Sequence, residues 1–382
     1  MSKIGVVVTT IGDGQFLAEY TRQIEEENRK EQVTIYVIPD LKSSKELWKA
    51  SQAEHDKGFD VRCISIPEQD VFAENCDLRN LIPYNSDNRR NIGYLMALGD
   101  GCEAILSMDD DNYPRAGTGF YQDHALVGFE AKLRTRSVRT HWYNVLADLG
   151  LPHVYPRGFP YRHREETCFF QEVDETRKVM INVGLWLGDP DLDAVTWVHG
   201  GVKATLFRGK SFFLGPHTWS PISSQNTAVH RDVMVSYYFL PMNTTVRGLE
   251  MDRYGDMFSG YFAEACAKHM GDGIRVGTPV VDHRRNSHQH WDDVRKELVC
   301  IGMVEDLMDW LVQETLEGKT YGEAYLSLAD KLEDAVERFH GSVWTVDARA
   351  YFHRAAYCMR RWTKVCTKVT ENRKDEQYAS VS

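Results

Sequence analysis

The first hundred residues alternate between short apolar runs and segments whose apolar residues recur at helical spacing. The apolar runs predict strands at 3–9, 33–38, 61–66 and 103–108. The helical spacing predicts helices at 15–31 and 88–98. Strands that alternate with helices indicate an open, largely parallel α/β sheet flanked by helices. Because ligands of such sheets bind at the carboxyl ends of the strands, the residues that follow each run are the first candidates for a site.

The rest of the chain has a different pattern. Residues 113–290 are irregular and rich in Gly, Pro, His and aromatic residues, which is typical of loops and added strands. Helical periodicity returns at 292–317, 321–340 and 346–368, and the last dozen residues are polar. We therefore expect an α/β domain at 1–291 with halves at 1–112 and 113–291, a helical extension at 292–370 and a disordered tail at 371–382.

Composition narrows the class of protein. The 382 residues carry a formal net charge of -11, which disfavours nucleic acid as a partner. No run of about 20 apolar residues exists, so we expect no membrane span. The eight cysteines form no CxxC pair, and the start of the chain lacks the long apolar stretch of a signal peptide. We expect a soluble, cytoplasmic protein with buried thiols, and the sequence leaves a homo-oligomer open.

The strongest chemical signal is the segment ILSMDDDNYP at 105–114, in which an apolar strand ends on Asp109, Asp110 and Asp111. Carboxylate oxygens are the ligands that Mn²⁺ and Mg²⁺ prefer, and such a cation can neutralise a diphosphate leaving group. Because side chains alternate along an extended segment, we expect Asp109 and Asp111 to hold the metal and Asp110 to face the other way. An acidic triplet can also be a solvated turn, but a buried strand directly before it favours the metal site.

Two further segments carry candidate chemistry. In VVDHRRNSHQHW at 280–291, His283 follows an apolar pair and can supply a neutral ligand to the same metal. We interpret His288 and His290 as loop histidines or substrate contacts, because two histidines without a partner cysteine are weak evidence for zinc. In MDRYGDMFSGYF at 251–262, Asp256 is either a catalytic base or acceptor-binding carboxylate, or the N-cap of a helix.

Several segments resemble the plant reversibly glycosylated polypeptides, which include the UDP-arabinopyranose mutases, and related GT-A glycosyltransferases. The segments are NRRNIGYLMAL at 88–98, ILSMDDDNY at 105–113, YPRGFPYRHREE at 155–166, GLWLGDPDLDA at 184–194, and QNTAVHRD through DHRRNSH at 225–288. They occur in the family's order over roughly residues 3–300. The pairing of RGFPYRxRE with GLWLxxPDxDA is the specific part of the resemblance.

The resemblance implies a GT-A-type (Rossmann-like) fold and a UDP-sugar donor bound with Mn²⁺ or Mg²⁺. It assigns Asp109–Asp111 to the metal and nucleotide motif, with Asp109 and Asp110 also on the nucleotide-sugar, and His283 to the metal site. Thr9, Thr10 and Asp40 correspond to strand ends that hold the uridine, and Arg90 to an arginine near the diphosphate. Arg157 matches the arginine that becomes reversibly glycosylated in the plant proteins. We expect Arg162 and Arg164 to pair with Glu165, Glu166 or solvent.

Three functions remain open at this point. The first is a transferase that moves a sugar from a UDP-sugar to a small-molecule acceptor, with Asp256 as base and Arg157 near the sugar or diphosphate. The second is a UDP-sugar mutase that interconverts pyranose and furanose rings, and the third is a non-catalytic sugar-nucleotide-binding subunit. One carboxylate of the family's paired acidic step is replaced by Gly255, and polar Asp87-Asn88-Arg89 replaces a small-residue stretch before Gly93. These departures favour the transferase.

Overall fold

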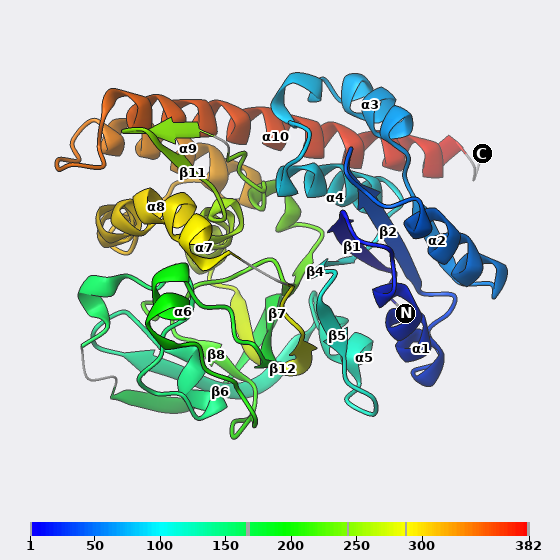
Figure 1. Ribbon diagram of the computed structural model, residues 1–382, viewed down its shortest axis with the longest axis horizontal. Coiled ribbons are helices and arrows are strands. Elements are labelled where there is room, and N and C mark those ends of the chain that lie inside the picture. The colour runs from blue at the N-terminus through cyan, green and yellow to red at the C-terminus, as the bar shows by residue number, and fades with distance from the viewer. Residues whose placement is uncertain (1, 166–168, 243, 287–288, 380–382) are drawn as a thin grey trace.

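One β-sheet, with both parallel and antiparallel strands, forms the centre of the protein (Figure 1). The computed structural model describes residues 2–165, 169–242, 244–286 and 289–379, and of residues 372–379 it describes the backbone only. Within these residues the strand order is β3-β2-β1-β4-β9-β7-β6-β8-β12-β5, and β7 also pairs with β12. A separate hairpin joins β10 (Thr244–Val246) to β11 (Leu249–Met251).

The N-terminal half is the parallel part of the sheet. Its strands are β1 (Ile4–Thr10), β2 (Val33–Pro39), β3 (Asp60–Cys63) and β4 (Ala104–Asp109). Its helices are α1 (Phe16–Glu26), α2 (Glu46–Asp56), α3 (Ile66–Asn75) and α4 (Arg90–Gly99). β2, β1 and β4 are buried almost throughout, as their continuous apolar runs predicted, and all four strands run parallel.

The third strand is shorter than the sequence predicted. It ends at Cys63, and α3 begins at Ile66 with Pro67 in its first turn. The Ser65 side chain accepts from the backbone N–H of Glu68, and the Glu68 side chain accepts from the backbone N–H of Ser65. This reciprocal pair is a capping box. The helix start therefore interrupts an apolar run that the periodicity alone assigned to a strand.

The irregular region 113–290 contains the antiparallel part of the sheet. Its strands are β5 (Asn112–Pro114), β6 (Glu130–Val138), β7 (Phe170–Gly188), β8 (Phe212–Leu214), β9 (Asn226–His230) and β12 (Gly273–His283). Its helices are α5 (Phe120–His124), α6 (Ala194–Gly200) and α7 (Gly255–His269). β9 pairs antiparallel with both β4 and β7 and so joins the two halves into one sheet.

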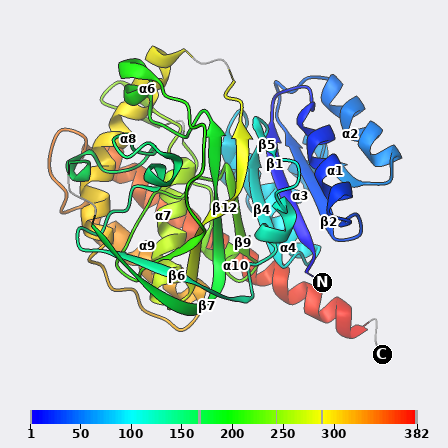
Figure 2. The same cartoon turned by 90° about the horizontal axis from the view of Figure 1, so that it is seen from below.

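The C-terminal extension consists of α8 (His290–Leu311), α9 (Tyr321–Val336) and α10 (Val346–Ala379). α10 packs on α9 at one end and on α4 at the other, so it crosses from one half of the protein to the other (Figures 1 and 2). It continues to Ala379 through most of the tail that we expected to be disordered, and residues 380–382 lie outside the described residues. No helix in the described ranges combines the length and the apolar character that crossing a membrane requires.

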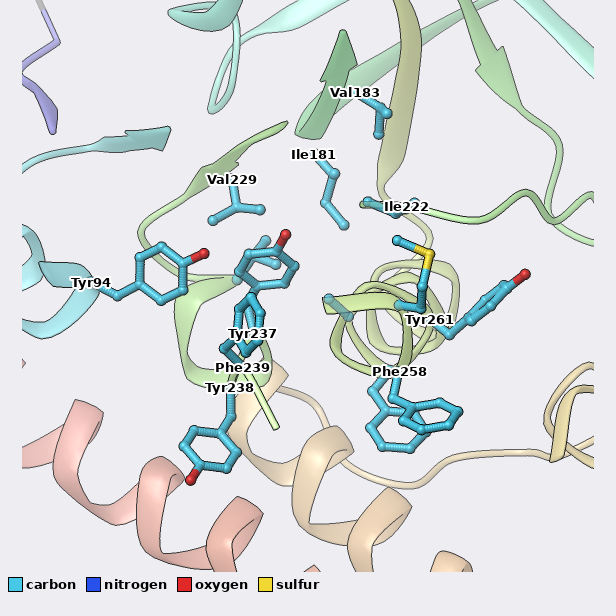
Figure 3. Close-up of a cluster of buried hydrophobic side chains, with 14 of the residues drawn as sticks. Tyr94, Ile181, Val183, Ile222, Val229, Tyr237, Tyr238, Phe239, Phe258 and Tyr261 are labelled. Atoms are coloured by element: carbon cyan, nitrogen blue, oxygen red, sulfur yellow. The ribbon is translucent and has the colours of Figure 1, made fainter. Parts of the chain in front are cut away.

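A buried cluster fixes the position of α7 against the sheet. Figure 3 shows Phe258 and Tyr261 of α7 on one side of this cluster and strand residues such as Ile181 and Val229 on the other. All four side chains are fully buried, and every residue of α7 up to Ala267 is buried. A helix covered on all sides cannot shift without opening the core, so its N-terminus, which carries Asp256, is held rigidly.

One glycine lets β7 and β12 end side by side. Gly188 has φ 83°, and a Cβ at this position would lie 2.4 Å from the backbone oxygen of His283. Gly188 and His283 are paired neighbours in the sheet, so the close approach places the predicted metal-site histidine at the end of β12. Only glycine combines this left-handed backbone with the lack of a side chain.

We predict that Gly188→Ala destabilises the protein through both effects. The left-handed backbone costs about 1–2 kcal/mol for an L-residue, and overpacking adds about 1–3 kcal/mol. Gly117→Ala is the matched control, since Gly117 has φ 71° but no atom within 4 Å of the place where the added methyl group would lie. Urea unfolding should give a clearly larger loss for Gly188→Ala, and equal losses would contradict the assigned contact.

Candidate active site

Two adjoining cavities open at the carboxyl ends of β1, β2 and β4. The larger has a volume of about 510 Å³ and the smaller about 270 Å³, and Thr9, Asp87 and Asp110 line both. Every site residue that the sequence predicted lines one of the two. The larger is lined by Thr9, Arg90, Asp109, Asp110, Asp111, Arg157, Asp256 and His283, and the smaller by Thr9, Thr10, Asp40 and Asp110. The fold thus brings these residues together, while their roles stay predictions.

The smaller cavity is built from the loops after β1 and β2. Asp40 is buried and accepts hydrogen bonds from the backbone N–H of Leu41 at 2.7 Å and of Ser86 at 3.1 Å. The Ser43 hydroxyl accepts from the N–H of Asp40 at 2.8 Å and donates to the carbonyl of Thr10 at 2.7 Å. These bonds tie the two strand ends to each other, so the cavity walls are fixed before any ligand binds.

The acidic triplet is not an alternating strand. β4 ends at Asp109, and Asp110 and Asp111 form a turn before β5. All three side chains therefore line the larger cavity, and the expectation that Asp110 faces away from it is wrong. Asp110 also reaches the first strand, because its Oδ2 accepts from the Thr10 hydroxyl at 2.5 Å.

Arg90 supports the triplet from the start of α4. Its buried guanidinium donates to Asp109 at 2.6 Å and to the Thr9 hydroxyl at 2.9 Å. It also donates to the hydroxyls of Ser107 at 3.0 Å and Ser224 at 2.8 Å. The arginine that the sequence placed near a diphosphate therefore also orients the first aspartate of the triplet.

Burial, and after it the charges of neighbouring groups, change the proton affinity of the triplet. Removal from bulk water, together with the charges of Asp111 and Asp109, raises the pKa of Asp110 to about 6. Burial also raises the pKa of Asp109 although Arg90 opposes the rise. Burial alone would raise the pKa of Asp111, but its contact with His283 brings that pKa below its ordinary value. Bringing a cation to this end of β4 would relieve the repulsion.

His283 is oriented toward the triplet by a backbone carbonyl. Its Nδ1 makes a hydrogen bond to the carbonyl oxygen of Asp189, and its Nε2 lies 3.4 Å from Oδ2 of Asp111. Donation from Nδ1 leaves Nε2 as the nitrogen that faces the cavity, which is the arrangement of a metal-ligating histidine. Among the described residues, however, no three His, Cys, Asp or Glu side chains are already arranged to hold a metal ion.

Arg157 lies between two buried aspartates. Its guanidinium donates to both oxygens of Asp191, at 2.9 and 3.1 Å, and to both oxygens of Asp256, at 2.9 and 2.8 Å. A further N–H donates to the carbonyl of Arg253, so each of the five donors of the guanidinium has an acceptor. All three charged side chains are more than nine-tenths buried. We call Arg157, Asp191 and Asp256 the arginine clamp.

The arginine clamp gives a physical reason for the two paired sequence motifs. RGFPYRHREE supplies Arg157 and Arg164, and GLWLGDPDLDA supplies Asp191 and Asp193. Arg157 binds Asp191, and Arg164 binds Asp193 at 2.6 Å. Two consecutive ion pairs therefore join the two motifs.

The described ion-pair partners of the other two arginines differ from the expected Glu165. Arg164 pairs with Asp193, and Arg162 pairs with acidic residues of α8, among them Asp306 at 3.3 Å. Glu166, one expected partner, lies outside the described residues.

Asp256 does not cap its helix. Tyr254 holds the cap position of α7 and Asp256 is in its first turn, where both of its oxygens contact Arg157. A carboxylate near a helix N-terminus is stabilised by the helix dipole as well as by the guanidinium.

His290 is the first residue of α8 and stacks on Trp197, with ring centroids 6.1 Å apart. His288 lies outside the described residues.

Sequence reasoning missed several residues that line the larger cavity. They are Asp87, Asp191, Trp197, Ser224, Gln225, Arg253, Arg285, Asn286 and Lys296. Asp191 had a signal, because it stands in the PDxDA motif that carries the family resemblance. Arg285 had the same kind of signal, because it stands in the DHRRNSH segment. Arg253 and Lys296 had a weaker one, since charged residues on a helix or loop are indistinguishable from a solvated surface in one sequence.

The fold and the site together define a GT-A-type α/β protein, with a parallel half that ends on an acidic triplet and an antiparallel half beyond it. The chain belongs to the family described as reversibly glycosylated polypeptide, whose sequence model matches residues 6–371. The family predicted from the motifs is confirmed.

Individual relatives are distant. Probable UDP-arabinopyranose mutase 4 of Arabidopsis thaliana is 23% identical over 303 residues, which cover 78% of this chain and 76% of the relative. Probable UDP-arabinopyranose mutase 1 of Pisum sativum is 24% identical over 300 residues, which cover 77% and 75%. Among solved structures, S. aureus TarS 1-349 in complex with UDP-GlcNAc is 13% identical, with a TM-score of 0.45 over 98% of this chain and 92% of that chain.

We predict that Arg157→Gln lowers the free energy of unfolding by about 3–5 kcal/mol, because it leaves two buried carboxylates without their cation. Arg162→Gln is the matched control in the same loop, since its side chain is 51% exposed and exposed ion pairs contribute about 0–1 kcal/mol. Chemical denaturation measures both. Similar losses for the two variants would show that the arginine clamp does not hold these segments together.

Proposed function

We propose that the protein is a metal-dependent transferase that moves a sugar from a UDP-sugar to a small-molecule acceptor. The observation that carries the proposal is the convergence of Asp109, Asp110 and Asp111 on one cavity, next to a smaller cavity at the ends of β1 and β2. The choice of uridine is supported by the relatives named UDP-arabinopyranose mutases. The choice of a nucleotide-sugar is supported by membership of the reversibly glycosylated polypeptide family.

The residues at the end of β4 fit a hard divalent cation. Asp109 and Asp111 present carboxylate oxygens to the cavity, and His283 directs Nε2 toward Asp111. Oxygen ligands with one imidazole suit Mn²⁺ or Mg²⁺. Burial first, and the neighbouring carboxylates after it, raise the pKa values of Asp109 and Asp110, and a bound cation would favour their ionised forms. The bound cation would neutralise charge on the leaving diphosphate.

The two cavities divide the donor between them. The smaller one, with Thr9, Thr10 and Asp40, has the size and the hydrogen-bonding groups for a uridine. The larger one, with the triplet and the arginine clamp, accommodates the diphosphate, the sugar and an acceptor. Asp110 lines both cavities, so it lies where the nucleoside and the diphosphate would join.

Asp256 is the proposed base of the transferase, and the arginine clamp determines how it acts. Both carboxylate oxygens are held by Arg157, which orients them and occupies them with hydrogen bonds. An acceptor hydroxyl must therefore displace one N–H of Arg157 before Asp256 can take its proton. Arg157 acts here as a positioning residue, because its place between two aspartates keeps it charged and raises its pKa although burial opposes the rise.

A mutase is the second candidate, and the same contact favours it. A mutase returns the sugar to the diphosphate and needs no base for a separate acceptor, so a carboxylate fully paired with Arg157 is no obstacle. The named relatives support this candidate as well. In this case Asp256 and Arg157 hold the sugar while its ring changes.

We predict that a panel of UDP-sugars incubated with the protein and Mn²⁺ gives UDP release that depends on an added acceptor and stops in EDTA. Chromatography should separate UDP from pyranose and furanose forms of the donor. Asp256→Asn should lower transfer by about 10²-fold or more, the scale of losing a general base, with UDP-sugar binding retained. Ring exchange without an acceptor would establish the mutase instead, and full turnover in EDTA would exclude both metal-dependent candidates.

A further inference from the structure

The larger cavity has a basic side that the proposed chemistry has not used. Arg253 precedes α7, Arg285 follows β12, and Lys296 lies in the second turn of α8, and all three line the cavity. Arg253 stands in MDRYGDMFSGYF, Arg285 in VVDHRRNSHQHW, and Lys296 five residues after the second motif. Sequence reasoning assigned a role to none of the three. The carboxylates that contact these three cations show how much of their charge is left for a ligand.

Arg285 is largely enclosed and has little charge compensation. Its side chain is only 10% exposed, and within the described part of the chain its one ion pair is to Asp293, at 3.4 Å. The guanidinium lies over the ring of Trp197, 4.7 Å from its centroid, and Trp197 is in turn stacked on His290. The stack fixes the guanidinium in place but supplies no acceptor for its N–H groups. A guanidinium has five donors, and within the described residues one of those of Arg285 has a side-chain acceptor, Oδ2 of Asp293 at 3.4 Å, which leaves the others for a ligand.

The nearby carboxylates are already engaged. Asp293 also lies 3.7 Å from Arg253, and Glu297 accepts from Arg253 at 2.7 Å and from the N–H of Ala194 at 2.7 Å. Lys296 lies 3.2 Å from Asp252. Burial, together with the positive charge of Arg253, lowers the pKa of Arg285 although Asp293, Asp191 and Glu297 oppose the shift.

The backbone holds Arg253 in an unusual conformation. Its φ is 65°, in the left-handed region that a long side chain adopts only when its surroundings impose it. Its carbonyl accepts from Arg157 of the arginine clamp, and its side chain is held by Glu297. The arginine clamp therefore also determines where the guanidinium of Arg253 lies.

We propose that Arg285 and Arg253 form an oxyanion subsite, which binds a phosphate or carboxylate group of the substrate. Two guanidinium groups fixed side by side in one cavity match the planar, bidentate recognition of such groups. The subsite rests on the proposed function, because it lies in the cavity assigned to the diphosphate and sugar. The oxyanion belongs either to the diphosphate of the donor or to an acidic group of the acceptor or sugar. The subsite therefore requires that the substrate carry a phosphate or carboxylate group at this position.

The test is Arg285→Gln, with Arg284→Gln as the matched control. Arg284 is exposed, lies over Tyr113 at 4.2 Å and does not line the cavity, yet its replacement removes the same charge from the adjacent position. Uridine and UDP are titrated calorimetrically in Mg²⁺, and inorganic phosphate is then titrated into the UDP-saturated protein. Arg285→Lys keeps the positive charge but loses the two parallel N–H donors of the guanidinium. It should bind the affected ligand, UDP or phosphate, with an affinity between those of wild type and Arg285→Gln.

Two outcomes support the subsite and identify its source. If the subsite holds the diphosphate of the donor, Arg285→Gln lowers the affinity for UDP by about 10- to 100-fold, the scale of charged hydrogen bonds. The affinity for uridine is then unchanged. If the subsite holds an acidic group of the acceptor or sugar, Arg285→Gln leaves the affinity for UDP unchanged. The affinity of the UDP complex for phosphate then falls by a similar factor.

The subsite is overturned if UDP and phosphate bind Arg285→Gln as tightly as they bind wild type. It is also overturned if Arg284→Gln loses as much affinity for these ligands as Arg285→Gln does. Failure of the proposed function is distinguishable. Wild-type protein would then bind neither uridine nor UDP, while phosphate alone would still bind wild type more tightly than Arg285→Gln.

Discussion

Negative charge gathered in one cavity is the constraint on which the rest of this structure depends. Six aspartates line the larger cavity, Asp87, Asp109, Asp110, Asp111, Asp191 and Asp256. Carboxylates this close cannot all remain ionised without cations beside them. Arg157 pairs with both Asp191 and Asp256, and Arg90 pairs with Asp109. His283 lies against Asp111. Asp110 has no ion pair in the described ranges, and burial together with the charges of Asp111 and Asp109 raises its pKa.

The same constraint connects the site to the architecture. Arg157 belongs to a loop of the antiparallel half, Asp191 to the loop after β7, and Asp256 to a helix buried in the core (Figure 3). One guanidinium thus joins three segments that are far apart in sequence, and its bond to the carbonyl of Arg253 extends the connection to the basic side of the cavity. Removing charge at this point changes both the fold and the site, which distinguishes the arginine clamp from ion pairs on the surface.

The sequence predicted the parts of the protein whose physics is local. The buried runs of β1, β2 and β4 are recognisable because a strand covered on both faces is apolar throughout. The capping box of Ser65 and Glu68 was also visible in the sequence, and using it would have placed the start of α3 correctly. β7 and β12 could not be predicted in this way, because their pairing with each other and with β8 and β9 joins distant segments, and bulges interrupt their periodicity. The arginine clamp is non-local for the same reason, since Asp191 and Asp256 are 34 and 99 residues from Arg157.

The central claim is that the carboxylates at the end of β4 bind a divalent cation together with a uridine diphosphate. Electron paramagnetic resonance of free Mn²⁺ during titration, with and without saturating UDP, tests it most directly. Because the cation and the diphosphate neutralise each other, each should strengthen binding of the other by the same factor. We expect at least a roughly tenfold rise in Mn²⁺ affinity with UDP in wild type and its loss in Asp111→Asn. Mn²⁺ affinity that is unchanged by UDP, or by Asp111→Asn, would contradict the claim.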